Sequence, residues 1–292
     1  MDIKRFWTIP AFERMLRLLP DSVYLRILYR KNVGVWPNLK NPQKFTEKIQ
    51  WLKMHNRKPE YSIMVDKFLV KDYVARIIGK EYIIPTLAVW ESVDDIDPNV
   101  LPEKFVLKWN HDSGSIVICK DKKNFDLTTA KKKLAWGERA NGFWYGREWP
   151  YKNVKPVIIA EQYMQECDNP DGDLTDFKFY CFNGMPMYCQ VIRDRNTKET
   201  IDFYDMEWKH QDFIGLNPVA RNGLTPVARP QHLDKMKDIC RMLADKAPFT
   251  RVDLYVINGR VYFGEITFFP ASGFGVFTPS VWDKKLGDLI KL

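Results

Sequence analysis

Three observations predict an α+β fold with two lobes around a cleft. The N-terminal part has helical periodicity, the middle holds short apolar β-rich runs, and the C-terminal part reads as mostly antiparallel strands with one helix. This order does not favour a doubly wound parallel sheet, which needs regular alternation of strands and helices. With 292 residues, 45% hydrophobic and 28% charged, the chain has the composition of an ordinary soluble protein with a sizeable core.

Helices are expected first. Apolar residues recur at helical spacing over residues 12–19, and Pro20-Asp21 begins a second segment. Asn41-Pro42 reads as an N-cap followed by proline at the first helical position. A further helix starts at Tyr61 and ends at Gly79, in the position that a C-terminal glycine takes.

The apolar period then changes to that of strands. "EYIIPTLAVW" and "KFVLKWN" are short and β-rich, and "GSIVICKD" follows after a turn, which predicts a hairpin. Asp126 is the expected N-cap of the helix "LTTAKKKLAWGER". "PVIIAEQYM" is expected to be the next strand, after a loop rich in Trp and Gly.

The C-terminal part is expected to be largely antiparallel. Strands are predicted in "FKFYCFNGMPMYCQVIRDR" and "ETIDFYDMEW", followed by a helix from His232 to Lys246. The ribbon "RVDLYVINGRVYFGEITFFPASG" comes next, and a short helix closes the chain. We therefore expect a basic helical region over residues 1–60, an N-lobe over 61–160 and a C-lobe over 161–292.

The cysteine pattern bears on the compartment. The five cysteines form no C-x-x-C pair and are odd in number, which argues against a zinc site or a disulfide framework. We expect a reducing compartment, the cytoplasm. No apolar run is long enough for a spanning helix, and the N-terminal stretch does not read as a secretory signal.

The net charge of +8 is concentrated at the N-terminus. Residues 1–60 contain 13 Lys and Arg against five Asp and Glu, and the other 232 residues contain 32 of each. A solvated helical face, a nucleic-acid patch and a surface for anionic lipid or a polyanionic substrate all fit this excess. Nucleic acid fits least, because no recognition motif accompanies the charge.

The ribbon carries charges among strongly apolar neighbours. Asp253 and Glu265 lie on two strands joined by Asn258-Gly259, at distances from the turn that let them face each other. Two carboxylates side by side and out of water need a shared cation or proton. A hard divalent ion such as Mg²⁺ meets that need, whereas pairing with Lys or Arg at the surface is the plainer alternative.

Two further stretches fit a phosphate ligand. Lys108 ends an apolar strand, and the backbone N–H groups of Ser113, Gly114 and Ser115 could surround a phosphate beside it. Glu161 begins "EQYM" where a strand gives way to extended chain, and free backbone groups there could read an adenine edge. Alone, each stretch equally fits a turn or strand end that meets water.

Together these motifs resemble the ATP-grasp superfamily, most closely its TupA-like branch, which is associated with bacterial surface-polysaccharide biosynthesis. The resemblance covers roughly residues 60–275. It implies two α+β lobes that clasp ATP, preceded here by N-terminal helices in place of the usual α/β domain. Members phosphorylate a carboxylate to an acyl phosphate, which an amine then attacks, and they use ATP and Mg²⁺.

The resemblance also implies roles for particular residues. Lys67 in "DKFLVKDYV" and Lys108 look like the phosphate-binding lysines, and residues 113–115 look like the mobile Gly-rich loop. Glu161, Gln162, Tyr163 and Met164 look like the linker that meets adenine.

In the C-lobe the resemblance places Lys178 near the phosphates and Arg251 beside the transferring phosphoryl group or the oxyanion. Asp253 and Glu265 are then the Mg²⁺ ligands. Thr267 stands where ligases of this type usually have an asparagine as a further metal ligand.

The implied function is an ATP-dependent carboxylate–amine ligase that joins an amine or amino acid to a uronic acid or acidic glycan. Its place would be the cytoplasm, with peripheral contact between residues 1–60 and the inner membrane or a lipid-linked glycan. A glycosyltransferase or a kinase of the same pathway is the alternative, and a binding module without catalysis is the third. The D-x-D pairs that a glycosyltransferase needs, Asp95/Asp97 and Asp171/Asp173, lie in polar turns.

Overall fold

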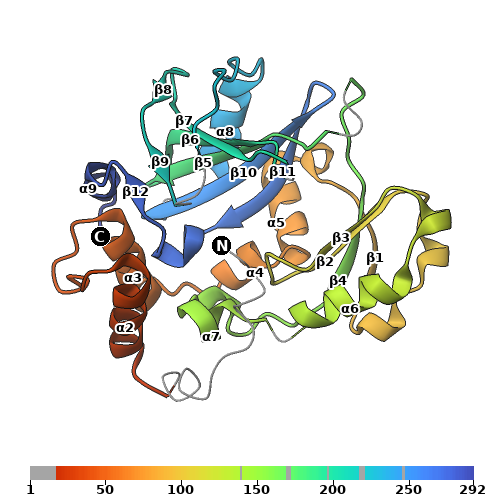
Figure 1. Ribbon diagram of the computed structural model, residues 1–292, viewed down its shortest axis with the longest axis horizontal. Coiled ribbons are helices and arrows are strands. Elements are labelled where there is room, and N and C mark those ends of the chain that lie inside the picture. Colours follow the sequence, from red (N-terminus) through yellow and green to blue (C-terminus); the bar gives the residue numbers. More distant parts are fainter. Residues whose placement is uncertain (1–17, 139, 169–171, 196, 217–220, 245–246) are drawn as a thin grey trace. The chain divides into compact units, whose positions relative to one another are not determined.

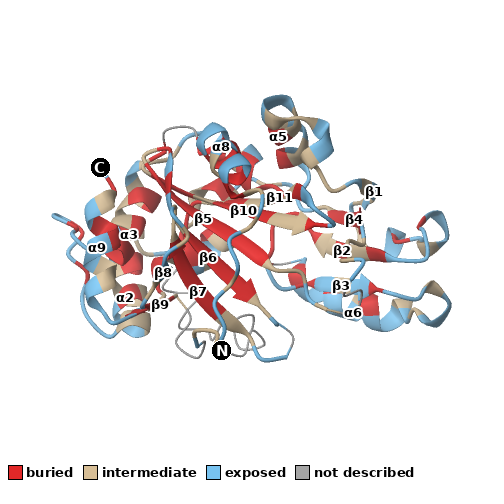
Figure 2. Ribbon diagram, turned by 90° about the horizontal axis from the view of Figure 1, so that it is seen from above, coloured by how far each residue is buried: buried red, intermediate tan, exposed pale blue. Residues whose placement is uncertain are grey.

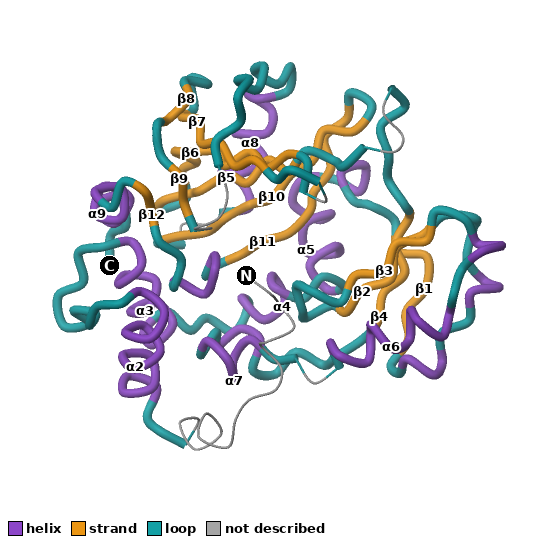
Figure 3. Tube along the Cα trace, viewed as in Figure 1, coloured by secondary structure: helices purple, strands orange, loops and turns teal. Residues whose placement is uncertain are grey.

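A computed structural model describes residues 18–138, 140–168, 172–195, 197–216, 221–244 and 247–292. Two compact units are distinguished. The first contains residues 18–19, 58–73 and 83–164, and the second contains residues 20–57, 74–82 and 165–292. Both combine helices with antiparallel strands, which confirms the predicted α+β class (Figures 1 and 3).

The first unit is built on a four-stranded antiparallel sheet in the order β1-β4-β2-β3. Its strands are short and apolar: β1 Thr86–Trp90, β2 Phe105–Trp109, β3 Ile116–Cys119 and β4 Ile158–Gln162. Its helices are α4 Tyr61–Val65, α6 Leu127–Gly137 and α7 Gly142–Gly146, and α5 Leu69–Ile78 carries the chain from this unit to the second. Single 3-10 turns lie at η3 Val93–Asp95, η4 Pro98–Val100, η5 Lys122–Asn124 and η6 Trp149–Tyr151.

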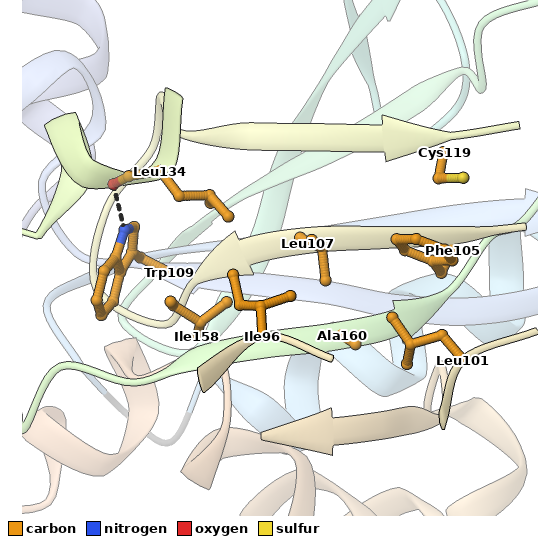
Figure 4. Packing of buried hydrophobic residues seen from close by; sticks show 9 residues of the cluster. All are labelled: Ile96, Leu101, Phe105, Leu107, Trp109, Cys119, Leu134, Ile158 and Ala160. Atoms are coloured by element: carbon orange, nitrogen blue, oxygen red, sulfur yellow. Dashed lines mark hydrogen bonds between the residues drawn. The ribbon is translucent and has the colours of Figure 1, made fainter. Parts of the chain in front are cut away.

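One face of this sheet packs into an apolar core, shown in Figure 4. In β2, Phe105, Leu107 and Trp109 are fully buried in this core, as the period of two along a strand requires. Helix α6 adds Leu134, whose carbonyl oxygen accepts a 2.7 Å hydrogen bond from the indole N–H of Trp109. Lys108 consequently lies on the opposite face of the sheet.

The second unit contains a six-stranded antiparallel sheet in the order β11-β10-β5-β6-β7-β8. Its strands are β5 Asp176–Phe182, β6 Met185–Arg193, β7 Thr200–Asp205, β8 His210–Gln211, β10 Phe249–Ile257 and β11 Arg260–Thr267. A two-stranded sheet pairs β12 Phe277–Thr278 with β9 Ile214–Gly215. Strand β5 is buried over its whole length, including Asp176 and Lys178 (Figure 2).

The helices of the second unit are α2 Asp21–Val33, α3 Phe45–His55, α8 Leu233–Leu243 and α9 Val281–Leu289, with 3-10 turns at η2 Lys80–Tyr82 and η7 Pro270–Gly273. Helix α8 contacts β5, β6 and β10. It buries the apolar stripe that its 3.6-residue period predicts.

Helix α9 meets the start of α3 at close range. A Cβ atom on Gly287 would lie 2.2 Å from the carbonyl oxygen of Gln43, so the contact requires glycine. Asp283 accepts hydrogen bonds from the N–H and the hydroxyl of Thr46, at 2.9 and 2.8 Å, and so caps α3 from another helix. The C-terminal helix thereby fixes the N-terminal helices within this unit.

Several expectations about element boundaries were wrong. Helix α3 begins at Phe45 and not at Asn41-Pro42, because Glu47 accepts the N–H groups of Gln43 and Lys44 and so places the cap later. The helix expected from Tyr61 is two helices. Asp66 accepts the N–H groups that begin the second, α5, and breaks the run.

Other local expectations were confirmed. Asp126 accepts the N–H of Thr129 and caps α6, and Gly79 has φ of 108° directly after α5. The β2–β3 hairpin forms as expected. Residues 12–17 of the first predicted helix lie outside the described residues. Among the described helices, none is long and apolar enough to cross a bilayer.

We predict that Gly287→Ala lowers the free energy of unfolding by about 1–3 kcal/mol, because the added methyl group overpacks the contact of α9 with α3. Lys284→Ala, at an exposed position of the same helix, is the control and should cost about 0.5 kcal/mol or less. Chemical denaturation measures both. Equal stability of the two variants would contradict the close contact.

Candidate functional site

A buried carboxylate joins two lysines in the first unit. Glu161 of β4 has one oxygen 2.6 Å from Nζ of Lys71 and the other 2.5 Å from Nζ of Lys108. Its side chain is 9% exposed. Lys71 also donates to the carbonyl oxygen of Ile84 at 2.9 Å and to the hydroxyl of Thr86 at 2.7 Å.

The strand register explains why these groups meet. Glu161 pairs with Val106 and Lys108 with Ile159, so Glu161 and Lys108 are diagonal neighbours on the face away from the core. Thr86 is the register partner of Glu161 on its other side. Lys71 comes from α5, and its ammonium group contacts both Glu161 and Thr86.

Burial sets the electrostatics of this cluster. It lowers the pKa of Lys71, and Glu161 opposes that shift. Burial alone would raise the pKa of Glu161, but Lys108 and Lys71 more than reverse it and lower that pKa. Two ammonium groups share one carboxylate, so this face of the sheet favours an additional anionic group.

Apolar side chains extend from the same face. Ile116 and Ile118 of β3 pair with Lys108 and Val106 and are exposed. Leu87 and Val89 of β1 are exposed as well. Strands β1 and β3 are opposite edges of the sheet, so these side chains flank the buried cations on both sides. Ile116 and Ile118 form an apolar strip beside Lys108, which suits a ligand with one flat apolar part and one anionic part.

Lys67, the other lysine expected to bind phosphate, contacts the loop after β2, and its role in phosphate binding stays a prediction. Its ammonium group donates to the carbonyl oxygen of Asp112 at 2.7 Å, so it holds the loop after β2. The loop is tightened further because Oδ2 of Asp112 accepts the N–H of Ser115. Ser113 and Gly114 are exposed at its tip, and Oδ1 of Asp112 is buried without a hydrogen-bond partner among the described residues.

The chain after Glu161 follows the edge of the sheet. The N–H of Gln162 donates to the carbonyl oxygen of Pro85, and Tyr163 has the ammonium groups of Lys104 and Lys120 each 5.9 Å from its ring centre. The assignment of residues 161–164 to adenine stays a prediction.

The second unit holds a matching cluster on the ribbon β10–β11. Asp253 is the direct register partner of Glu265, and Arg251 that of Thr267. The register shifts after this pair, so that Leu254 pairs with Phe263 and Gly264 is the extra residue. Gly264 fits there because a Cβ atom would lie 2.9 Å from the ring of Tyr255.

Arg251 forms hydrogen bonds with three side chains of the ribbon, those of Asp253, Glu265 and Thr267. Its guanidinium group contacts both oxygens of Asp253, at 2.6 and 2.7 Å, and reaches Glu265 at 3.1 Å. It also donates to the hydroxyl of Thr267 at 2.9 Å, and that hydroxyl donates to Glu265 at 2.6 Å. A bidentate pair of this kind fixes geometry as well as charge.

Lys178 extends the cluster to a third carboxylate. Its ammonium group is bonded to Asp253 and lies 3.4 Å from Asp176, which also accepts from Arg195 at 2.7 Å and from Tyr255 at 3.0 Å. Burial would lower the pKa of Arg251, but Asp253 and Glu265 more than reverse it and raise that pKa. The positive charge that the neighbouring carboxylates Asp253 and Glu265 need is therefore supplied by the guanidinium group of Arg251.

The donor chemistry of the ribbon fits Mg²⁺. Asp253, Glu265 and Thr267 offer only oxygen atoms, and Mg²⁺ is commonly held by one or two carboxylates together with water and substrate phosphates. No group of three or more His, Cys, Asp or Glu side chains in the described parts of the chain is placed to hold a metal ion. A metal here would therefore depend on ligands from a bound substrate.

Sequence reasoning missed Lys71 and Asp176. Asp176 could have been found, since D-x-K in β5 places Asp176 and Lys178 on one face of a strand, as R-x-D does for Arg251 and Asp253. For Lys71 the sequence offered only its spacing of four from Lys67.

A family model described as TupA-like ATPgrasp matches residues 47–291. The chain belongs to the TupA-like ATP-grasp family. The match includes both charged clusters, and the ATP-grasp fold expected from the sequence is confirmed by it.

Several solved structures are also similar to this chain, at low sequence identity. D-alanine–D-alanine ligase from Bacillus anthracis, complexed with ATP, is 17% identical with a TM-score of 0.44, over 78% of this chain and 63% of that one. The Helicobacter pylori ligase of the same name is 15% identical with a TM-score of 0.41, over 85% and 70%. The ATP-grasp ligase PsnB with its minimal precursor is 11% identical with a TM-score of 0.40, over 73% and 54%.

This chain thus spans less than two thirds of the Bacillus anthracis ligase. No curated protein matches its sequence.

A strained turn follows the ribbon. Ala271, Ser272 and Gly273 have successive φ values of 48°, 52° and 63°, a left-handed conformation that costs residues with a Cβ atom about 1–2 kcal/mol each. Two buried side chains of α3 hold it. Gln50 donates to the carbonyl oxygens of Ser272 and Gly273, and Lys53 donates to the carbonyl oxygen and hydroxyl of Ser272.

We predict that Ala271→Gly leaves the protein as stable as before or stabilises it by up to about 1 kcal/mol, because glycine has no left-handed penalty. Ala135→Gly, at an exposed position in α6, is the matched control and should destabilise by about 1 kcal/mol. Thermal denaturation compares them. A loss of stability in both variants would contradict the strain at Ala271.

We predict that Glu161→Gln destabilises the chain by about 3–5 kcal/mol, since two largely buried ammonium groups lose their carboxylate. Replacing Lys71 with Met in the same chain should restore part of this loss, because one uncompensated charge is removed. Denaturant unfolding of the single and double variants measures the coupling. Simple additivity would contradict the shared pair.

Proposed function

We propose that this protein is an ATP-dependent carboxylate–amine ligase that acts through an acyl phosphate. The observation that carries the proposal is the buried Lys71–Glu161–Lys108 cluster, in which two cations share one carboxylate beside an exposed apolar strip. A nucleotide has the matching parts, a flat base and a charged phosphate chain. Membership of the ATP-grasp family supports the same reading.

In this proposal Lys71 and Lys108 bind ATP phosphates. Residues 161–164 and the apolar strip receive the adenine. The exposed tip at Ser113 and Gly114, with Ser115, offers backbone N–H groups to the phosphates, and Lys67 positions that loop through Asp112. In this proposal Lys67 positions the phosphate-binding loop, and Lys71 contacts the phosphates directly.

Asp253 and Glu265 would hold Mg²⁺, with Thr267 beside them. When bound, the ion would neutralise charge on the phosphates. Lys178 and Arg251 hold and orient these carboxylates through the contacts described above. Arg251 is also the group placed to stabilise charge that develops on the reacting oxygen.

The proposed reaction proceeds in two steps. A carboxylate oxygen of the acceptor attacks the γ-phosphorus of ATP, the bond to the β,γ-bridging oxygen breaks, and ADP leaves. An amine nitrogen then attacks the carbonyl carbon of the acyl phosphate, loses a proton and expels inorganic phosphate, which leaves an amide. Both steps develop negative charge on oxygen, which fixed cations stabilise.

The substrate class follows from the family's name and association. We propose a uronic acid or acidic glycan as the carboxylate and an amine or amino acid as its partner, in surface-polysaccharide biosynthesis. The protein would act in the cytoplasm, with peripheral contact to the inner membrane through the basic N-terminal region. A kinase that stops after phosphoryl transfer uses the same groups and is a defined outcome of the test.

A glycosyltransferase has less support from the described residues. Oδ1 of Asp97 accepts the N–H of Asn99 and caps a 3-10 turn, which is the ordinary use of aspartate in a loop. Asp95 ends the preceding 3-10 turn. Asp171 lies outside the described residues.

The test is ADP release from Mg-ATP by the purified protein with glucuronate, galacturonate or glutamate, and hydroxylamine as the amine. We expect ADP release that needs a carboxylate, together with hydroxamate formation. Phosphorylated product without hydroxamate would indicate the kinase instead. Neither ADP release nor ATP binding under any condition would contradict the proposal.

Asp253→Asn should lower Mg²⁺-dependent turnover by about 10²–10³-fold, because a carboxylate oxygen is lost where charge must be balanced. Asp234→Asn, an exposed carboxylate of α8, is the matched control and should retain full turnover. Glu265→Gln, at a more exposed position, keeps the comparison usable if Asp253→Asn fails to fold.

A further inference from the structure

The N-terminal helices of the second unit carry a stretch with one sign of charge. Residues 22–46, from within α2 to the start of α3, contain five Lys and Arg and no Asp or Glu. Four of these cations are exposed: Arg30, Lys31, Lys40 and Lys44. This stretch therefore has a positive field that no acidic residue of its own sequence offsets.

An apolar tip lies in the middle of this stretch. Val35 is 45% exposed and Trp36 is 62% exposed, in the loop between α2 and α3 that Figure 1 shows at the left. Trp109 in the first unit, by contrast, is fully buried. A large aromatic ring next to a valine, both in water, is unfavourable unless something else covers them.

The tip is held rigidly by its base. Gly34 ends α2 with φ of 86°, and its N–H donates to the carbonyl oxygen of Arg30 at 3.1 Å. The guanidinium group of Arg30 in turn donates to the carbonyl oxygen of Gly34. On the other side Arg26 donates to the carbonyl oxygen of Pro37 at 3.2 Å, and Pro37 is buried.

A fixed loop that keeps its apolar residues exposed is preorganised for binding. Because Gly34 and Pro37 are already bonded, inserting Val35 and Trp36 into an apolar phase requires little further ordering of the chain. Flexible surface loops lack this advantage.

We infer that the loop 34–37 and its surrounding cations form a docking surface for an anionic lipid bilayer. Trp36 and Val35 enter the region between headgroups and acyl chains, where an amphipathic indole is favoured. The three exposed lysines and Arg30 contact the lipid phosphates. Nucleic acid fits less well, since an aliphatic side chain at the tip gains nothing from phosphates or base edges.

This inference names the residues that would make the peripheral membrane contact in the proposed function. It rests on that membrane contact and on no other element of the proposed function. It does not use the ligase chemistry. Failure of vesicle binding would leave ATP turnover untouched, and failure of ATP turnover would leave vesicle binding untouched, so the two can be told apart.

The experiment is co-sedimentation of the full chain with vesicles of phosphatidylcholine, with and without phosphatidylglycerol. We expect binding only with phosphatidylglycerol and weaker binding at high salt. Trp36→Ala should lower the partition coefficient about tenfold, the loss expected for one buried aromatic side chain. The double variant Lys31→Glu/Lys40→Glu should lower it by at least as much.

The chain offers matched controls in the first unit. Trp136 of α6 is 60% exposed, as Trp36 is, but α6 begins after Asp126 and lies against η3 with its two aspartates. Trp136→Ala should keep full vesicle binding. Lys132→Glu/Lys133→Glu changes the net charge as much as Lys31→Glu/Lys40→Glu does and should also keep it.

Equal losses for the two tryptophan variants, or for the two charge-reversed variants, would overturn the inference. So would equal binding to neutral vesicles, or no vesicle binding alongside tight binding of single-stranded RNA. All the substituted side chains are exposed: those of Trp36 and Lys40 lie in the loop between α2 and α3, and the others lie on helices. Unchanged thermal unfolding can therefore be verified for every variant.

Discussion

The carboxylate of Glu161 keeps two lysine side chains together in a place where water is largely excluded, and the proposed nucleotide chemistry depends on that arrangement. Burial lowers the pKa of Lys71, and the carboxylate of Glu161 opposes that shift. One carboxylate for two ammonium groups keeps both in place and leaves an excess of positive charge. Phosphate oxygens are the natural complement of such an excess.

The second unit applies the same constraint with the signs exchanged. Asp253 and Glu265 face each other across β10 and β11, and Arg251 lies between them and holds both. Lys178 likewise forms ion pairs with both Asp253 and Asp176. These two cations offset the repulsion between the neighbouring carboxylates, which in the proposed function would hold Mg²⁺.

Much of this could be predicted from residue patterns, because strand periodicity is a local property. The closeness of Asp253 and Glu265 follows from counting to the turn Asn258-Gly259, whereas their direct pairing depends on the extra residue, Gly264. Helix boundaries were less predictable. Glu47 and Asp66 each accept hydrogen bonds from backbone N–H groups nearby. These bonds outweighed the helix-start signal at Asn41-Pro42 and the apolar run after Tyr61.

Long-range contacts were the part that sequence could not supply. Lys71 and Lys67 are four residues apart near the start of α5, yet one reaches Glu161 and the other holds Asp112. The difference depends on where β1 and β4 pass, which no local pattern contains. The same holds for Lys53, a lysine that reads as a surface residue but lies fully buried against a strained turn.

The central claim is that the cluster around Glu161 is the phosphate-binding part of a nucleotide site. Calorimetric titration of ATP into the full chain, with and without Mg²⁺, tests it most directly when the native protein is compared with Lys71→Met and with Lys132→Met as an exposed control. We expect saturable binding that Mg²⁺ strengthens, with affinity at least about tenfold lower in Lys71→Met alone. Native affinity in Lys71→Met, or no binding of ATP by the native chain, would contradict the claim.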